Sequence, residues 1–332
     1  MKTFPKTGAF GHALRRLTVA AGLSLIAATA AAQGAFPSQP ITLVVGFPPG
    51  GSNDIVARIV APKVSSILGV PVVVENRAGA NATIGTDSVV RAKPDGYTIT
   101  LGSASPMAIS PHTYSKLPYN PVKDLRTITT VAQTPELIAV NPSVPAKTLA
   151  EIVDLSKKQE LTFSSSGAGG LPHLAIELLK TESGGKVVHV PYKGASPAVT
   201  DAAGGHVSGV IMDLPALKAM VEAKKLVPIA VTHTERSNVM PDVPTSIEAG
   251  LPNVLAFNWF AIMAPAKTPD DVVNTLHAAF VKAAHDPEVV KQLGEAGITP
   301  FTQASPAEAH KFLEAETERW GKVARAANVK AD

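Results

Sequence analysis

Short apolar runs rich in β-branched residues alternate along the chain with longer segments whose apolar residues recur at helical spacing. The first run, Ile41 to Val45, is followed by a segment from Ser52 to Leu68 in which apolar residues return every three or four positions. The same order continues with an expected strand over 70–76, a short helix over 84–91 and a strand over 97–101. This alternation predicts an α/β fold in which helices flank largely parallel sheets.

Several later elements are marked by their first residues. The segments Thr148 to Glu151 and Ser305 to Glu308 are capping boxes, in which a hydroxyl and a carboxylate cap the first amides of a helix. Ser196 followed by Pro197 predicts another helix start, and a helix is expected around 246–249. The stretch 127–145 holds two apolar runs separated by Gln133-Thr134-Pro135, which predicts a strand that leaves one sheet and enters another.

The N-terminus has the pattern of an export signal. Residues 1–32 carry basic residues, then the apolar run Leu17 to Ala28, then three alanines before Gln33. This order predicts a secretory signal peptide that is cleaved before Gln33. The alternative, a membrane anchor, is disfavoured because the apolar run is shorter than the ~18 to 20 residues that span a bilayer. Arg15-Arg16 leaves the twin-arginine and general export routes both open.

Without this leader, the charge of the chain changes sign. The whole chain has 30 basic and 27 acidic residues, but the leader holds four of the basic and none of the acidic ones. The remainder, with 26 basic residues against 27, lacks the basic face that nucleic-acid binding requires. The chain has no cysteine, which excludes disulfides, thiolate metal sites and a lipid-modified N-terminal cysteine. We therefore expect a soluble periplasmic protein that is not a lipoprotein. The roughly 300 residues after the leader exceed what one core usually organises, so two lobes are expected.

A glycine-rich turn follows the first apolar run. Gly50 and Gly51 separate the expected strand from the helix that begins at Ser52. Glycines let the backbone approach a ligand closely, and the free N–H groups at a helix start favour an anion. The turn lacks the Lys-Ser/Thr ending of a nucleotide P-loop and the spacing of a dinucleotide fingerprint. It predicts a binding site for a carboxylate or a phosphate.

The same design occurs a second time, because a β-rich run from Leu161 leads through serines and glycines into a helix that ends near Lys180. In open α/β sheets, ligands bind at the carboxyl ends of strands, so two such loops can hold an anion between two lobes. Neither loop contains Lys or Arg, and their amides alone could supply micromolar affinity. A third small-residue loop, 102–106, could equally face a ligand or cap the next segment.

The residues expected of common enzymes are missing. The sequence has no Gly-x-Ser-x-Gly elbow, and its nine histidines show no His-x-x-x-His spacing. No cofactor and no metal ion are therefore expected, and the chain is not expected to be an enzyme. Asp54 at the first helix start is interpreted as a support of that helix rather than as an acid catalyst.

Three other residues could lie near a ligand. His173, at the second helix start, could contact a ligand or simply pack. Tyr192 could line a cleft, whereas Trp259 lies in an apolar run that favours the core.

Five stretches of the sequence resemble the Bug family, the extracytoplasmic solute receptors of tripartite tricarboxylate transporters. They occur in order over the whole chain after the leader: FPPGGSNDIVARIVAPK, VVVENRAGANATIGTDSVVRAKPDGYT, SSSGAGGLPHLAIELL, VPYKGASPAVTDAAGGHV and PDVPTSIEAGLP. The resemblance implies the two-lobed type II periplasmic-binding fold, with a mainly parallel sheet flanked by helices in each lobe and a ligand cleft between them. The crossings are expected near Thr134 and Ala256, so that one lobe contains 33–134 and 256–332, and the other contains 135–255.

The resemblance also implies a function and a binding site. The receptor would capture a small carboxylate, such as a di- or tricarboxylate, an amino acid or an aromatic acid, and deliver it as a monomer to the permease subunits of the transporter. The positions that match the family's ligand loops are Pro48, Pro49, Gly50, Gly51 and Ser52 in the first loop, and Ser164, Ser165, Ser166, Gly167, Ala168 and Gly169 in the second, with Ser103 and Asp213 as secondary candidates. The chain departs from the family's usual residues at Ala78, Ala82, Gly170 and Ser208, and Gly170 adjoins the second loop.

Two other functions remain open at this point. A sensor would present the carboxylate-bound form to a signalling partner instead of a permease. A periplasmic enzyme would need catalytic residues that the sequence does not offer.

Overall fold

The structure, a computed structural model, describes residues 1–3 and 36–332. Residues Gln39–Asp332 form one compact unit. The predicted leader falls on residues 4–35 apart from its first three residues, so the leader and its cleavage site lie outside the described part of the chain. Within residues 36–332, no helix combines the length and the apolar character that crossing a membrane requires.

The strands join in the order β2-β1-β3-β9-β4-β7-β5-β6, and β8 and β10 also pair with β4. Three strands at each end of this order are parallel to one another, whereas β9 and β4 in the middle run antiparallel to their neighbours. The strand bounds are β1 Ile41–Val45, β2 Val72–Asn76, β3 Thr98–Ser103, β4 Leu125–Val140, β5 Leu161–Ser165, β6 Val187–Pro191, β7 Gly209–Asp213, β8 Val227–Val231, β9 Phe257–Pro265 and β10 Thr299–Pro300.

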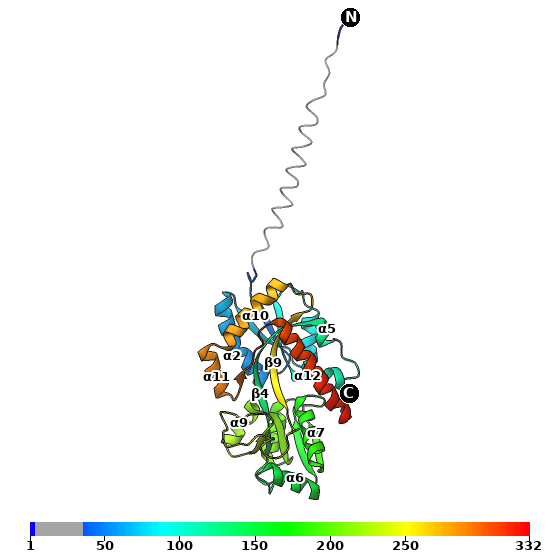
Figure 1. Ribbon diagram of the computed structural model, residues 1–332, viewed down its shortest axis with the longest axis vertical. Helices are drawn as coiled ribbons and strands as arrows, with labels where there is room; N and C mark the ends of the chain where they lie inside the picture. The colour runs from blue at the N-terminus through cyan, green and yellow to red at the C-terminus, as the bar shows by residue number, and fades with distance from the viewer. Residues whose placement is uncertain (4–35) are drawn as a thin grey trace. The chain divides into compact units, whose positions relative to one another are not determined.

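The long strand β4 belongs to both halves of this arrangement. From Leu125 to Pro135 it pairs with β9, and from Glu136 to Val140 it pairs with β7. The sequence predicted such a change of partner at the interruption between its two apolar runs, and the pairing confirms it. Figure 1 shows β4 and β9 passing between one group of helices that includes α2, α10 and α11 and another that includes α6, α7 and α9. The boundaries of the two lobes themselves stay a prediction.

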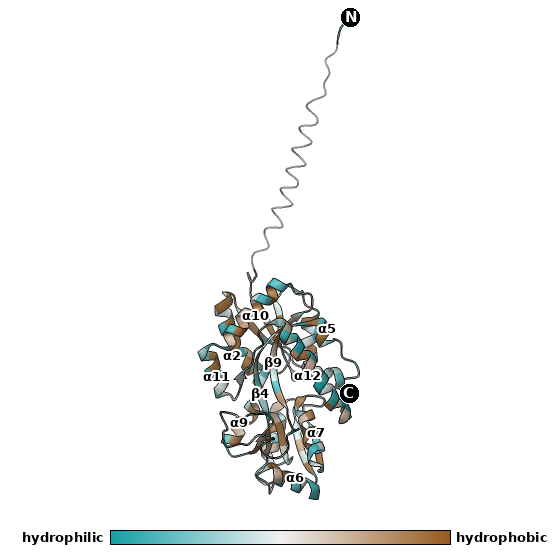
Figure 2. Ribbon diagram, in the orientation of Figure 1, coloured by the Kyte–Doolittle hydropathy of each residue, from teal (hydrophilic) through white to brown (hydrophobic). Residues whose placement is uncertain are grey.

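The helices lie mostly between successive strands, as expected of an α/β fold. Their bounds are α2 Ser52–Leu68, α3 Thr83–Val90, α4 Ser110–Thr113, α5 Pro121–Asp124, α6 Leu149–Lys158, α7 Leu171–Ser183, α8 Ala195–Gly204, α9 Leu214–Glu222, α10 Asp270–Ala284, α11 Pro287–Glu295 and α12 Pro306–Ala326, with a π-helical turn, η1, at Ser105–Ile109. In Figure 2, helices such as α2, α7 and α10 carry both hydrophobic and hydrophilic colours, which fits helices that bury one face.

The predicted helix starts are confirmed where a side chain caps the helix. Thr148 accepts the amide of Glu151 in a complete capping box, and Ser305 accepts the amide of Glu308. The prediction at Ser196 was wrong, because α8 begins at Ala195 after the N-cap Gly194, whose φ of 114° favours glycine. The segment 246–249 forms turns rather than a helix.

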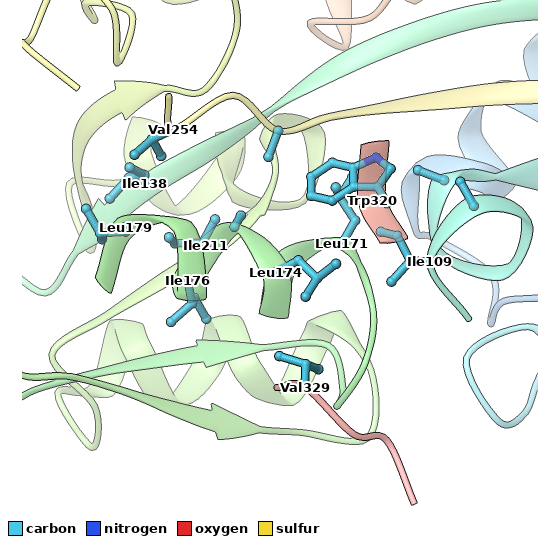
Figure 3. Close-up of a cluster of buried hydrophobic side chains, with 14 of the residues drawn as sticks. Ile109, Ile138, Leu171, Leu174, Ile176, Leu179, Ile211, Val254, Trp320 and Val329 are labelled. Atoms are coloured by element: carbon cyan, nitrogen blue, oxygen red, sulfur yellow. The ribbon is translucent and has the colours of Figure 1, made fainter. Parts of the chain in front are cut away.

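One large apolar cluster connects the two ends of the strand order. Leu171 and Leu174 of α7 and Ile211 of β7 belong to it together with Ile109 of η1 and Trp320 of α12. Figure 3 shows the Trp320 ring beside Leu171 and Ile109. A second cluster packs α8 and α9 against β4 and β7, on the face of these strands opposite to the first cluster. The helix that follows the second small-residue loop is therefore held by core contacts from several elements.

Candidate functional site

The first small-residue loop connects β1 to α2. The N-cap of α2 is Gly51, and no side chain caps the helix start. Gly50 has a φ of 87°, in the region that favours glycine, whereas Gly51 has a φ of −83° that any residue can adopt. A Cβ added at Gly51 would meet only the carbonyl oxygen of Pro48, at 3.9 Å. The space in front of Gly51 is therefore open to a ligand.

Asp54 holds this loop in place. Its Oδ2 accepts the Gly50 N–H at 3.0 Å, and its Oδ1 accepts the Asn76 Nδ2–H at 2.9 Å. Burial by itself would raise the pKa of Asp54, but the hydrogen bonds from Arg58, Gly50 and Asn76 outweigh it and keep that pKa below its usual value. These contacts agree with the interpretation of Asp54 as a support. Because the Gly50 N–H donates to Asp54, it is not free to bind a ligand.

The first loop therefore offers fewer amides than its sequence suggests, and different ones. Gly51, Ser52 and Asn53 lie at the start of α2, and their N–H groups donate to no other group in the described part of the chain. Pro48 and Pro49 have no N–H, and both are exposed beside Gly50. A carboxylate would thus meet a short row of amides at the positive end of the helix dipole.

The second small-residue loop connects β5 to α7, and its own residues shape it. The Ser165 hydroxyl donates to the carbonyl oxygen of Gly167 at 2.9 Å, and the Gly169 N–H donates to Nδ1 of His173 at 3.0 Å. The buried Ser164 hydroxyl donates to the carbonyl oxygen of Ala198 at 3.0 Å. The Ser164 hydroxyl thus points into the protein, and its proton is already donated to another part of the chain.

The amides that remain in the second loop are those of Ser166, Ala168 and Gly170, which donate to no other group among residues 36–332. Gly170 is the N-cap of α7 and has no side chain of its own to cap this helix. Two helix starts with glycine at the N-cap and free amides beside it are consistent with the two anion-binding loops that the sequence predicted.

Two stacked histidines contact the second loop through Ser165 and Gly169. The rings of His173 and His189 lie 3.7 Å apart and nearly parallel, and His189 Nε2 lies 2.6 Å from the Ser165 hydroxyl. Burial, with a smaller contribution from Lys180, lowers the pKa of His173 to about 4. Burial, with a smaller contribution from His173, lowers the pKa of His189 to about 3. Both rings are neutral at ordinary pH, so His173 accepts the Gly169 N–H and brings no positive charge to the loop. The contact assigns His173 a packing role that the sequence left open.

The second loop touches residues from the other end of the strand order. The Leu171 N–H donates to the Ser105 hydroxyl oxygen at 3.0 Å, and the Thr113 hydroxyl donates to the carbonyl oxygen of Gly169 at 3.0 Å. A Cβ on Gly170 would lie 3.2 Å from both the Asn81 amide and the Ser105 hydroxyl. The loop at 102–106 thus provides a cap, although for a distant helix rather than for the segment that follows it.

Asn81 belongs to a strained turn that lies between the two loops. Ala80, Asn81 and Ala82 have φ values of 46°, 52° and 70°, in a region that costs residues with a side chain about 1–2 kcal/mol each. A Cβ on Gly46, just before the first loop, would lie 2.5 Å from the Ala82 Cβ. Consecutive strained residues are typical of functional sites. The sequence did not assign Asn81 to the site, because only the fold brings it against Gly170.

The secondary candidates Ser103 and Asp213 lie near this region. The Ser103 hydroxyl is buried and has no hydrogen-bond partner in the described part of the chain. Asn258 Nδ2 donates to Oδ2 of Asp213 at 3.0 Å, and Asn258 Oδ1 accepts the N–H of Ala104, next to Ser103, at 3.2 Å. Asn258 therefore joins the ends of β7 and β3, a role that no local pattern in the sequence indicates.

The sequence matches the model of the family described as the tripartite tricarboxylate transporter family receptor over residues 56–329. The chain belongs to this family. Protein BugT of Bordetella pertussis is 35% identical over 298 residues, which cover 89% of this chain and 91% of BugT.

Two solved structures that share this fold are described with a small acid. One is described as R. palustris Rpa4515 with adipate and is 33% identical to this chain. The two structures superpose over 89% of this chain and 99% of the relative, with a TM-score of 0.84. The other, MatC (Rpa3494) from Rhodopseudomonas palustris with bound malate, is 28% identical, and covers 87% of this chain and 99% of its own at a TM-score of 0.79.

The family membership makes this protein a solute-binding receptor of the transporter class rather than an enzyme. Among residues 36–332, no group of three or more His, Asp or Glu side chains is placed to hold a metal ion. Trp259 is buried and donates to Glu316 at 3.0 Å, which confirms its assignment to the core. Tyr192 is partly buried, and its hydroxyl donates to Asp201 at 2.6 Å.

Proposed function

We propose that this receptor binds a small carboxylate between two lobes, 33–134 with 256–332 and 135–255, in the periplasm and delivers it as a monomer to the membrane subunits of a tripartite transporter. The observation that carries the proposal is the pair of helix starts with glycine at the N-cap, Gly51 and Gly170, in loops that have free amides and lack Lys and Arg. The free amides of both loops would bind the acid groups of one ligand.

The solved relatives support the choice of ligand class. Adipate and malate are both dicarboxylates, and the two structures that hold them cover nearly the whole of this chain after residue 35. The change of partner along β4 between Pro135 and Glu136 supports the lobe boundary. The Glu136 N–H also donates to the carbonyl oxygen of Ala256, so both proposed crossings lie side by side.

Calorimetric titration of the purified receptor with a panel of acids tests the proposal. The panel contains adipate, malate, a tricarboxylate, acidic amino acids and an aromatic acid, with the amide of the best acid as a neutral control. We expect at least one acid to bind with micromolar affinity or better. The amide derivative should bind at least about tenfold more weakly, because it lacks the negative charge that the backbone N–H groups favour. An absence of binding across the panel would contradict the proposed function.

Delivery needs a separate test. The ligand-bound receptor should associate with its membrane subunits more strongly than the ligand-free receptor, as measured with the subunits in detergent or nanodiscs. Equal association with and without the acid would leave carboxylate binding intact and overturn delivery.

A further inference from the structure

A second acidic residue lies behind Asp213. Glu136 of β4 and Asp213 of β7 are directly paired in the antiparallel register of these strands. Glu136 is 0% exposed, and Asp213 is 9% exposed. Paired positions in neighbouring strands bring side chains within contact distance. Two carboxyl groups therefore share a site that is almost closed to water.

The surroundings give Glu136 no donor. Neither of its carboxyl oxygens has a hydrogen-bond partner in the described part of the chain when both groups of the pair are taken as carboxylates. Glu177 is also buried, but its carboxylate pairs with Lys180 at 3.2 Å. A buried charge without a partner is costly, so the pair needs a proton. With one proton on Glu136, the two groups can form a hydrogen bond.

Asp213 in turn connects this pair to the ligand loops. Its Oδ2 accepts from Asn258, whose Oδ1 accepts the N–H of Ala104. The next residue, Ser105, accepts the N–H of Leu171 at the start of α7. A continuous set of hydrogen bonds and chain neighbours thus leads from Glu136 to the second loop.

We propose that Glu136 is a positioning residue that stays neutral and donates a hydrogen bond to Asp213, which holds Asp213 and Asn258 in place and keeps a second negative charge away from the carboxylate site. This inference rests on the proposed function. It assigns to the site a fully buried residue that the sequence did not single out.

The electrostatics of the surrounding elements agree with a neutral Glu136. Burial, then the charge of Asp213 and a hydrogen bond with it, raise the pKa of Glu136 well above its usual value. Asp213 is the charged group that acts on Glu136. Two titratable side chains on nearby segments have other partners: Arg319 donates to the carbonyl oxygen of Leu255 and to Glu316, and His233, whose pKa is lowered by burial, packs against Phe257. Two adjacent carboxylates facing a bound anion would repel both it and each other.

The first experiment compares Glu136→Gln, a neutral donor of the same shape, with Glu136→Leu, which has no donor. Titration with the acid that binds the wild-type receptor best should give Glu136→Gln an affinity within about threefold of wild type, and Glu136→Leu a loss of about tenfold or more. Glu177→Gln is the matched control and should change affinity little. A loss in Glu136→Gln as large as in Glu136→Leu would overturn the proposal, because a charged carboxylate would then be required.

Infrared difference spectroscopy of the folded receptor tests the protonation state without a ligand. At neutral pH, wild type should show the C=O stretch of a protonated carboxyl, which Glu136→Gln lacks and Glu177→Gln keeps. The stability should follow the same group. Because its pKa is raised, the contribution of Glu136 is fully present below its usual pKa and is lost as the pH rises through the folded value, so Glu136→Gln should gain in Tm over wild type at high pH.

The outcomes separate this inference from the proposed function. If no acid binds the wild-type receptor, the proposed function and the binding role of Glu136 both fail, while the infrared band still decides whether Glu136 is neutral. If acids bind but the band is absent at neutral pH, the inference fails and the proposed function stands.

Discussion

Replacing Gly51 by valine is expected to reduce carboxylate affinity by at least about 100-fold while the fold is retained. The valine side chain would extend into the open space in front of Gly51 and cover the N–H groups of Ser52 and Asn53. Each lost hydrogen bond to a charged group costs about 1.5–3 kcal/mol, and two of them account for a change of this size. The φ of −83° at Gly51 is accessible to valine, so the backbone need not change.

Calorimetry with the best-binding acid measures this effect, and circular dichroism with thermal unfolding checks the fold. Gly294→Val in α11 is a suitable control, because its Cβ would meet only the Asn238 side chain, at 3.5 Å. Unchanged affinity in Gly51→Val would remove the first loop from the site.

Replacing Trp320 by alanine is expected to lower the free energy of unfolding by about 3–5 kcal/mol. The ring is 0% exposed, its Nε1–H donates to Glu316 at 3.1 Å, and the Arg319 guanidinium lies 4.5 Å from the ring centre. It packs beside Leu171 and Ile109, so its removal would open a cavity beneath the start of α7 (Figure 3).

Urea unfolding followed by the fluorescence of Trp259, the other tryptophan, measures this loss. Val290→Ala is the control, because Val290 is exposed on α11 and its truncation should cost less than about 0.5 kcal/mol. A loss below about 1 kcal/mol in Trp320→Ala would show that α12 does not carry the core that supports the second loop.

Much of the fold could be predicted because its signals are local. The helix from Ser52 to Leu68 was predicted with the bounds that it has, since its apolar spacing and the closing Gly69, with a φ of 72°, both mark it. The capping box at Thr148 and the interruption in β4 before Glu136 are likewise indicated by a few neighbouring residues.

The candidate site was predicted only as far as its loops. Glycine and serine marked both loops, but Gly50 gives its amide to Asp54, and Gly169 gives its amide to His173. Such use of a donor depends on side-chain directions that local sequence does not determine.

The remaining contacts are between distant parts of the chain. Asn258 meets Ala104 across 154 positions and Asp213 across 45. Asn81 meets Gly170 in the same way, through the packing of two loops. No periodicity or spacing in a single sequence indicates such pairs, so these residues could be assigned only from the structure.

The most direct test of the account is the response of the backbone amides in the two loops to a ligand. In a ¹H–¹⁵N spectrum of the receptor titrated with its best-binding acid, we expect the largest shifts at Gly51, Ser52 and Asn53 and at Ser166, Ala168 and Gly170. The amides of Gly50 and Gly169 should move less, because Asp54 and His173 already bind them. Large shifts confined to residues outside both loops would contradict the claim that the free amides at these two helix starts bind the carboxylate.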